Sequence, residues 1–386
     1  MANTYFSFSN RLSGMLAFMK LDRVELYELN VKLRFRFETS FGVEQELRKV
    51  LLVLHSDGLI GYGEGTANNT PGYSYETVDT VWTALSRYIL PQVMGRDYAT
   101  PAQLLHDLRF IRGHNMAVGA LETALWDIQA KAAGLPLWQL LGGLRTAHPV
   151  GASLGVQKSV EDTVDIAQKH ADEGYKRLKF KIKPGWDVAP LRAVREALPD
   201  MALTVDANSA YKLTDARVFQ ELDELGLDYI EQPLAFDDLI DHAQLQAMLA
   251  TPICLDESVH SPEDARKGLQ LGSGRVINLK VGRVRGHLHA RRVHDVALSF
   301  GAPVWCGGML ELGVGRAHNL HLSSLEGFTL PGDTSSASRY WEEDIVDPWL
   351  DAVDGVQHIP EGHGIGVTLN EDAVEKFSVR KEVFTG

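Results

Sequence analysis

Short apolar segments alternate with longer amphipathic segments at a regular interval between residues 148 and 333. Successive segments of this kind are typical of βα units on a parallel sheet, and eight units close into a barrel. The pattern therefore predicts an α/β protein with a TIM-type (β/α) barrel of seven to eight units. The candidate strands are VGASLG, RLKFKI, ALTVDA, DYIEQ, ICLDE, VINLKV, PVWCGG and FTLPGD.

Polar residues and glycine mark the ends of the helices expected between these strands. Ser159 and Ser261 are each followed three residues later by an aspartate, which predicts helix N-caps. Pro262, directly after the second of these serines, is typical of a first helical turn. Thr214 is expected to begin another helix and Gly226 to end it.

A different pattern precedes the barrel. Residues 24–33 and 49–56 alternate as strands do, the GYGEG segment (residues 61–65) is interpreted as a turn, and residues 117–133 are expected to form a helix. Strands followed by helices predict a separate α+β domain. We place this domain at residues 20–147.

The other expected limits are an N-terminal extension at 1–19, the barrel at 148–345, and a C-terminal segment at 346–386 that returns to pack on the N-terminal domain. The extension lacks the basic end, long apolar region and cleavage site of a signal peptide. No apolar run reaches the length that spans a membrane. We therefore expect a cytoplasmic protein without a membrane partner.

The net charge of −13 would repel polyanions, which argues against a nucleic-acid partner. The one basic stretch, residues 283–292, is interpreted as the solvated face of a helix.

Cys254 and Cys306 lie in apolar strand-like segments, so we expect buried free thiols and no disulfide.

Five ionisable residues fall at the ends of consecutive predicted strands, one in each βα unit. Their separations along the chain are 25, 25, 25 and 24 residues. Because the carboxyl ends of the strands of a barrel meet at one rim, we expect the five side chains to form a ring there. They are Lys181, Asp206, Glu231, Asp256 and Lys280.

The alternation of side chains along a strand predicts which way these residues point. In RLKFKI, Leu178, Phe180 and Ile182 share the face that must cover the outer helices, so Lys179 and Lys181 point into the barrel. The same alternation turns the aspartate of ALTVDA and the lysine of VINLKV inward.

Three carboxylates that converge in a partly buried site repel one another unless a cation neutralises them. Oxygen ligands from three strands suit Mg²⁺, and Mn²⁺ or Co²⁺ are expected substitutes. No His/Cys set along the chain competes as a zinc site.

The lysines come from the second and the sixth predicted strands, which lie opposite each other in an eight-stranded barrel. A carboxylate substrate held on the metal would sit between them. A cation bound to its oxygens stabilises the enediolate that forms when a lysine removes the proton from the neighbouring carbon. The ring therefore predicts an enzyme that abstracts an α-proton.

These motifs resemble the enolase superfamily, specifically its muconate lactonising enzyme-like subgroup and the o-succinylbenzoate synthase and N-acylamino acid racemase group, from about residue 33 to 368. The resemblance implies an N-terminal capping domain. LKFKIKPGWD is similar to the family's KxK motif, which implies Lys181 as an acid/base and Lys179 as its electrostatic partner; INLKVGRVRG implies Lys280 as the second acid/base.

TVDANSAY, YIEQPL and CLDES resemble the family's three metal strands. The resemblance implies Mg²⁺ ligands at Asp206, Glu231 and Asp256, with Asn208 and Glu257 next to them.

RFETSFG (residues 36–42) and GTANNTPGYSYET (residues 65–77) are similar to the two capping loops that close over the site, and CGGMLE (residues 306–311) resembles a substrate-contacting strand end. The substrate-binding residues implied in this way are Phe41, Ser153, Gly307, Gly308, Met309 and Glu311.

The run GGMLELGVGR is alternatively a phosphate-binding nest. Family members commonly form homo-oligomers, and we expect the same here.

The eighth predicted strand bears on the choice of reaction. Dipeptide epimerases of the superfamily carry a DxD pair there that holds a free ammonium, whereas FTLPGDTSSASRYW offers Asp333 alone. A small-molecule carboxylate without a free amine fits better. We expect o-succinylbenzoate synthase activity (a dehydration in the menaquinone pathway), N-acylamino acid (N-succinylamino acid) racemase activity, or both. Muconate cycloisomerase and dipeptide epimerase are the alternatives within the superfamily, and a non-catalytic metal-binding barrel is a remote one.

Overall fold

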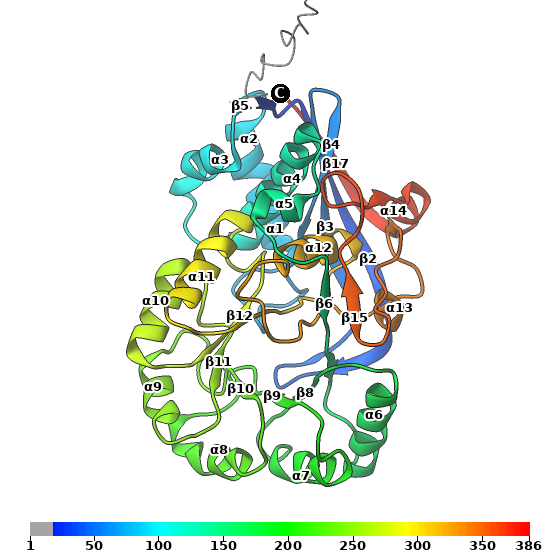
Figure 1. The fold of residues 1–386 in the computed structure, drawn as a ribbon. Coiled ribbons are helices and arrows are strands. Elements are labelled where there is room, and N and C mark those ends of the chain that lie inside the picture. The colour runs from blue at the N-terminus through cyan, green and yellow to red at the C-terminus, as the bar shows by residue number, and fades with distance from the viewer. Residues whose placement is uncertain (1–17) are drawn as a thin grey trace, which may run out of the picture.

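The computed structural model describes residues 18–386 (Figure 1). Nearly all of the predicted N-terminal extension lies outside the described residues. The barrel occupies the lower half of Figure 1, and the N-terminal helices and strands lie above it, beside the red C-terminal elements. None of the helices within residues 18–386 combines the length and the apolar character needed to cross a membrane.

The N-terminal domain is built on a four-stranded antiparallel sheet with the order β17-β2-β3-β4. Its strands are β2 (Arg23–Glu38), β3 (Val43–Ser56), β4 (Leu59–Gly65) and β17 (Ser378–Thr385). A two-stranded pair, β1 (Met19–Lys20) and β5 (Asp97–Tyr98), adds to this domain. The helical elements are α1 (Val78–Thr83), η1 (Ala84–Ile89), α2 (Leu90–Val93), α3 (Pro101–Asp107), η2 (Leu108–Phe110), α4 (Asn115–Ala133) and α5 (Leu137–Leu141).

The prediction of a turn at GYGEG is wrong, because these residues belong to β4; the turn lies before them, at Asp57 and Gly58, which both have positive φ. The glycines serve a close approach of helix α4 to the sheet. A Cβ atom at Gly61 or Gly63 would overlap the carbonyl oxygen of Ala124 or Ala120, respectively. Glycine signals both turns and close packing in a sequence, and only the packing applies here.

Seven parallel strands form the barrel sheet, in the order β13-β12-β11-β10-β9-β8-β7. They are β7 (Ala152–Leu154), β8 (Leu178–Lys181), β9 (Leu203–Asp206), β10 (Tyr229–Glu231), β11 (Ile253–Leu255), β12 (Val276–Leu279) and β13 (Val304–Cys306).

The eighth predicted strand, residues 328–333, is not a regular strand. It joins the two edges of the sheet through single parallel bridges, Val304 to Phe328 and Val150 to Gly332. Pro331 has no amide hydrogen to donate, which prevents a continuous ladder. The barrel is therefore completed by an irregular segment.

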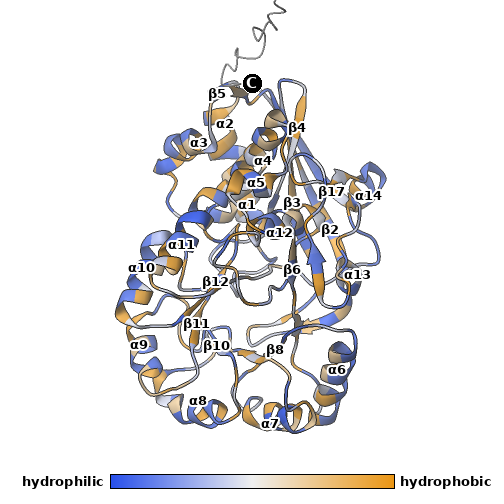
Figure 2. Ribbon diagram, viewed as in Figure 1, coloured by the Kyte–Doolittle hydropathy of each residue, from blue (hydrophilic) through white to orange (hydrophobic). Residues whose placement is uncertain are grey.

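The helices between the strands surround the barrel, and Figure 2 shows hydrophobic and hydrophilic bands side by side on them. They are α6 (Val160–Asp172), α7 (Val188–Ala197), α8 (Ala216–Asp223), α9 (Ile240–Gln246), α10 (Pro262–Leu271), α11 (His287–Ser299), α12 (Gly313–Leu322) and α13 (Ala337–Tyr340).

The predicted N-caps at Ser159 and Ser261 are confirmed, since each hydroxyl accepts a hydrogen bond from the amide three residues later. The predicted start at Thr214 is wrong. This residue lies within a 3₁₀ turn, η3 (Leu213–Asp215), and α8 begins after it.

The last elements return to the N-terminal half of the chain. Strand β17 pairs with β2. Before β17, strand β14 (Val346–Asp347) pairs with β16 (Thr368–Leu369), which is followed by α14 (Glu371–Phe377). Strand β15 (Val356–His358) pairs with β6 (Ala147–Pro149), which precedes the barrel. Cys254 and Cys306 are free and buried, as predicted.

The interpretation of residues 283–292 as a solvated helix face is wrong for its first half. Arg283 and Arg285 precede α11, and they are only 1% and 9% exposed; His287 is fully buried. Arg285 donates hydrogen bonds to the carbonyls of Leu108 and Ile111. A buried arginine persists where its donors are matched, and this one joins the barrel to the N-terminal domain.

We expect Gly63→Ala to lower the free energy of unfolding by about 1–3 kcal/mol, because the added methyl group forces α4 away from β4. Chemical denaturation measures the change. Gly42→Ala is the matched control, since a Cβ atom there meets nothing within 4 Å. Equal stability of the two variants would contradict the close packing.

Candidate active site

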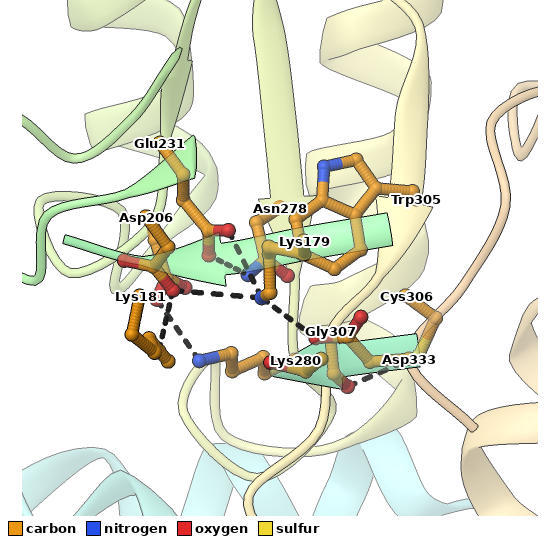
Figure 3. Close-up of polar contacts among 12 residues, drawn as sticks. Lys179, Lys181, Asp206, Glu231, Asn278, Lys280, Trp305, Cys306, Gly307 and Asp333 are labelled. Carbon is orange, nitrogen blue, oxygen red and sulfur yellow. Dashed lines mark hydrogen bonds and ion pairs between the residues drawn. The ribbon is translucent and has the colours of Figure 1, made fainter. Parts of the chain in front are cut away.

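Lys179 lies at the centre of a charged cluster at the C-terminal ends of the barrel strands. Its Nζ atom is 3.0 Å from Glu231 Oε2, 3.5 Å from Asp206 Oδ2 and 2.7 Å from Asp333 Oδ2. Figure 3 shows these side chains pointing toward one another. The Nζ atom also lies 4.6 Å from the centre of the Trp305 ring, an arrangement typical of a cation–π contact.

Lys181, two residues further along β8, contacts the neighbouring strand. Its Nζ atom donates to Asp206 Oδ2 at 2.6 Å and to Asn208 Oδ1 at 2.7 Å. Asn208 has a positive φ of 42° and donates to Glu257 Oε1 at 2.9 Å. The predicted residues of β8, β9 and the end of β11 therefore form one hydrogen-bonded group.

Lys280 follows β12, three strands beyond β9 in the sheet. Its Nζ atom is 2.9 Å from Asp256 Oδ2 and 3.0 Å from the hydroxyl of Tyr73. Arg283 forms an ion pair with the other oxygen of Asp256 and donates to the same tyrosine at 2.9 Å. Tyr73 comes from the N-terminal domain, so both domains build this side of the site.

The buried charges shift the pKa values of the carboxyl groups in different directions. Burial opposes ionisation of Asp206, but the nearby Lys181 and Lys179 outweigh it and lower its pKa. Burial and the charge of Asp206 raise the pKa of Glu231. The same two causes raise the pKa of Glu257 to about 7. These shifts follow from placing several carboxylates in one buried space.

One small cavity of about 60 Å³ is lined by all three lysines, Lys179, Lys181 and Lys280. Among its lining residues are Lys181 and Lys280, from opposite sides of the barrel, and Phe37 from the end of β2. Three of the predicted substrate-binding residues also line it, namely Ser153, Gly308 and Glu311.

The other three predicted substrate-binding residues lie beside the cavity rather than along it. Gly307 packs against the lysine, since a Cβ atom there would lie 2.7 Å from Lys280 Cε and would overlap Asn278. Met309 is buried in the core of the N-terminal domain. Phe41 is half-buried, and its ring lies against Gly72 in the second predicted capping loop.

The glycine-rich run 307–316 contacts carboxylates of the protein itself, which argues against the alternative of a phosphate nest. The first amides of α12 are occupied by carboxylates. Leu312 N and Gly315 N donate to Glu64 at 3.0 and 2.8 Å, and Gly313 N donates to Asp344 at 2.9 Å. A helix start that already binds two carboxylates disfavours a further anion there.

Lys49 supports the same loop from the N-terminal domain. It is fully buried, and its Nζ atom donates to the carbonyl of Met309 at 2.7 Å. Burial raises the pKa of Glu64, which lies in the same charged group, to about 8. Glu311 accepts hydrogen bonds from Met309 N and Asn319 Nδ2. These contacts fix the loop that follows β13 against the site.

Asp333 is not available to a substrate ammonium in this structure. Its carboxylate is 2.7 Å from Lys179 Nζ and 2.7 Å from Arg177 Nη2. Burial opposes its ionisation, but the charges of Lys179 and Arg177 hold its pKa well below the usual range. The carboxylate therefore serves an internal network.

The carboxylates suit a divalent cation by their chemistry. Asp206, Glu231 and Asp256 are at most 1% exposed and offer only oxygen ligands, which Mg²⁺ prefers. Within residues 18–386 no three acidic, histidine or cysteine side chains are arranged as a metal-binding group. Cationic side chains already occupy the two aspartates. Lys280 and Arg283 form ion pairs with Asp256, which also accepts a hydrogen bond from Tyr73. Lys179 and Lys181 form ion pairs with Asp206.

Sequence reasoning missed several residues of the site. Arg283 and Arg177 gave no signal because each lies in a stretch that resembles an ordinary basic or apolar segment. Tyr73 lies in a segment that was expected to be a capping loop, but the tyrosine itself was not singled out. Alternation along the strand places Asn278 on the inner face with Lys280 but gave it no role, and it donates to Glu231 at 2.7 Å.

Family models match both halves of the chain. Residues 23–142 match the mandelate racemase / muconate lactonizing enzyme N-terminal domain, and residues 162–373 match the enolase C-terminal domain-like family. Members of the enolase superfamily combine a lysine or histidine base with one or two Mg²⁺ ions.

The chain is also similar to individual proteins over most of its length. It is 55% identical to the N-succinylamino acid racemase of Thermus thermophilus, over 94% of this chain and 98% of the relative. It is 48% identical to the o-succinylbenzoate synthase of Geobacillus kaustophilus, over 95% and 98%, respectively. Muconate cycloisomerase 1 of Rhodococcus opacus is more distant, with 30% identity over 89% and 94%.

A crystal structure of an enolase superfamily member from Listeria innocua superimposes with a TM-score of 0.92 and 36% identity, over 95% of this chain and 99% of that one. The predicted resemblance is thus confirmed by family models, relatives and fold. The chain belongs to the enolase superfamily of enzymes, within its mandelate racemase / muconate lactonizing enzyme family.

Proposed function

We propose that this protein removes a proton from the carbon beside a carboxylate, and that its substrates are N-succinylamino acids, which it racemises, and the precursor of o-succinylbenzoate, which it dehydrates. The observation that carries the proposal is the pair of lysines, Lys181 and Lys280, that line one cavity from β8 and from the end of β12. The similarity to a racemase and a synthase at 55% and 48% identity supports the same two reactions.

Each lysine has a separate role in this proposal. Lys181 Nζ and Lys280 Nζ face the substrate carbon from opposite sides, so one removes the proton and the other returns it on the opposite face. In the dehydration one lysine removes the proton and then assists the departure of hydroxide. Lys179 stays protonated, because Asp333 and Glu231 raise its pKa against the effect of burial.

Mg²⁺ is the proposed cofactor, with Mn²⁺ or Co²⁺ as substitutes. Asp206, Glu231 and Asp256 would hold it, and when bound it supplies positive charge that stabilises the negative charge building on the substrate carboxylate. Asn208 and Glu257 would hold the ligands in place. Binding competes with the ion pairs that now engage the aspartates, so we expect affinity for Mg²⁺ to rise as these lysines are removed.

The state of Asp333 favours an acylated substrate over a dipeptide with a free ammonium. With Lys179 and Arg177 both 2.7 Å from its carboxylate, Asp333 has its negative charge balanced within the protein. An ammonium group would have to displace a buried ion pair, which costs several kcal/mol. This argument disfavours the dipeptide epimerase alternative.

We place the enzyme in the cytoplasm as a homo-oligomer, with the dehydration serving menaquinone synthesis. Three residues are proposed to act from beside the cavity, namely Phe41, Gly307 and Met309. Their proposed role is to shape the loops that carry the lining residues Ser153, Gly308 and Glu311.

Purified protein with Mg²⁺ should racemise N-succinylmethionine or dehydrate the cyclohexadiene precursor of o-succinylbenzoate. Removal of the metal with a chelator should abolish both activities, and added Mg²⁺ should restore them, because the buried carboxylates need a divalent cation to act on an anionic substrate. Optical rotation and the absorbance of the aromatic product are the measurements. Inactivity on both substrates, together with turnover of muconate or a dipeptide, would contradict the proposal.

In deuterium oxide, Lys181→Ala and Lys280→Ala should each lose α-proton exchange from one enantiomer of N-succinylmethionine, by about 100-fold or more, and the two variants should differ in which enantiomer is affected. Proton NMR of the α-hydrogen measures the exchange. Lys176→Ala, which removes an exposed lysine before β8, is the control and should exchange both enantiomers. Equal exchange of both enantiomers in a cavity variant argues against two opposed bases.

A further inference from the structure

Arg177 is a fully buried arginine inside the barrel, one residue before β8. Because side chains alternate along a strand, Arg177, Lys179 and Lys181 all point into the barrel, one above another. The two lysines line the small cavity of about 60 Å³, whereas Arg177 lies outside its lining. Any influence of the arginine on the reaction must therefore pass through another side chain.

Asp333 is that intermediate side chain, because it contacts both Arg177 and Lys179. Its Oδ1 atom accepts a hydrogen bond from Arg177 Nη2 at 2.7 Å, and its Oδ2 atom lies 2.7 Å from Lys179 Nζ. The centre of the Trp305 ring lies 5.1 Å from Arg177 Cζ and 4.6 Å from Lys179 Nζ. Each oxygen of the carboxylate is thus matched to one cation in a buried space, where charges interact strongly.

The surroundings of Arg177 indicate that its charge matters more than its hydrogen bonds. Besides Asp333, it donates to the carbonyl of Pro331 at 3.0 Å. Its Nε and Nη1 atoms are buried and have no hydrogen-bond partner among residues 18–386, and unmatched donors of this kind lower stability. A Cβ atom at Gly151 would lie 2.7 Å from Nε, so this glycine leaves the space that the guanidinium fills. The fold accommodates an arginine here at a cost in stability, which points to a use for its charge.

The carboxylates around Lys179 show why a further cation is needed. Figure 3 shows Lys179 between Asp333 on one side and Asp206 and Glu231 on the other. The Mg²⁺ proposed above would compensate the latter two. Asp333 would then remain as a negative charge 2.7 Å from Lys179 Nζ and would cancel the positive charge that this lysine offers to a substrate. Arg177 supplies the compensating charge to Asp333 from outside the cavity.

We propose that Arg177 is a positioning residue that compensates the charge of Asp333 and so leaves the charge of Lys179 available to the reacting carboxylate of the substrate. The inference rests on the proposed function. Negative charge builds on the substrate carboxylate when the α-proton leaves, and a cation fixed beside it stabilises that charge. Racemisation and dehydration both begin with this step, so both depend on Arg177.

A double-mutant cycle of Arg177→Met and Asp333→Asn in the Mg²⁺-loaded enzyme tests the proposal. Arg177→Met should lower kcat for the racemisation of N-succinylmethionine by about tenfold or more and change KM by no more than about threefold, because the lost stabilisation belongs to the transition state. Adding Asp333→Asn should raise kcat again by about threefold or more, since the amide removes the surplus negative charge and keeps an oxygen that can accept from Lys179. Arg177→Lys, which keeps the charge, should lie between the wild type and Arg177→Met.

A purely structural role of Arg177 predicts the opposite sign for the second substitution. Asp333→Asn would then add its own damage, so that kcat of the double variant is equal to or lower than that of Arg177→Met, and this outcome would overturn the proposal. The matched control is the exposed ion pair of Arg217 and Glu221 on α8. Arg217→Met, Glu221→Gln and their combination should all keep the kcat of the wild type.

Chemical denaturation of the metal-free variants gives a second measurement, which needs no activity. Arg177→Met and Asp333→Asn should each lower the denaturation midpoint, because each leaves a buried charge without one of its partners. The double variant should lose less than the sum of the two single losses, and losses that add fully would overturn the inference. If the wild type turns over neither proposed substrate, the proposed function fails, whereas the cycle of midpoints still decides whether Arg177 compensates Asp333.

Discussion

The balance of buried charge at the barrel rim is the constraint on which the rest of this structure depends. Asp206, Glu231 and Asp333 are all nearly inaccessible to solvent, and one ammonium, that of Lys179, contacts all three. Removing one partner from such a cluster leaves an uncompensated buried charge, which costs about 3–5 kcal/mol. The backbone segments that carry these residues, β8, β9, β10 and the irregular segment 328–333, are thereby drawn to a common point.

The N-terminal domain is part of the site rather than an addition to it. Tyr73 bridges Lys280 and Asp256, and Lys49 holds the carbonyl of Met309 across the domain boundary. Phe37, at the end of β2, lines the small cavity. The barrel therefore supplies most of the charged groups of the site, whereas the N-terminal domain contributes Tyr73 and part of the cavity wall.

Much of the catalytic ring could be predicted from the sequence, because it depends on two local periodicities. The βα repeat places one residue at each strand end, and the alternation along a strand turns it inward. The same logic failed where a local signal has two meanings. The GYGEG glycines indicate a turn as well as close packing, and only the position of α4 decides between them. Arg283 looked like part of a basic helix, although it precedes α11 and reaches Asp256. The eighth strand carries Pro331, whose missing amide outweighs the apolar character of its neighbours.

The hydrogen-bond partners of the three lysines separate their roles. An ammonium group has three donors. The Nζ atom of Lys179 lies within ion-pair distance of three carboxylates, those of Asp206, Glu231 and Asp333, and 4.6 Å from the centre of the Trp305 ring. Lys181 and Lys280 each have two polar partners among the described residues, of which one is a carboxylate. The larger number of carboxylates around Lys179 supports the electrostatic role proposed for this lysine and the acid/base roles proposed for Lys181 and Lys280.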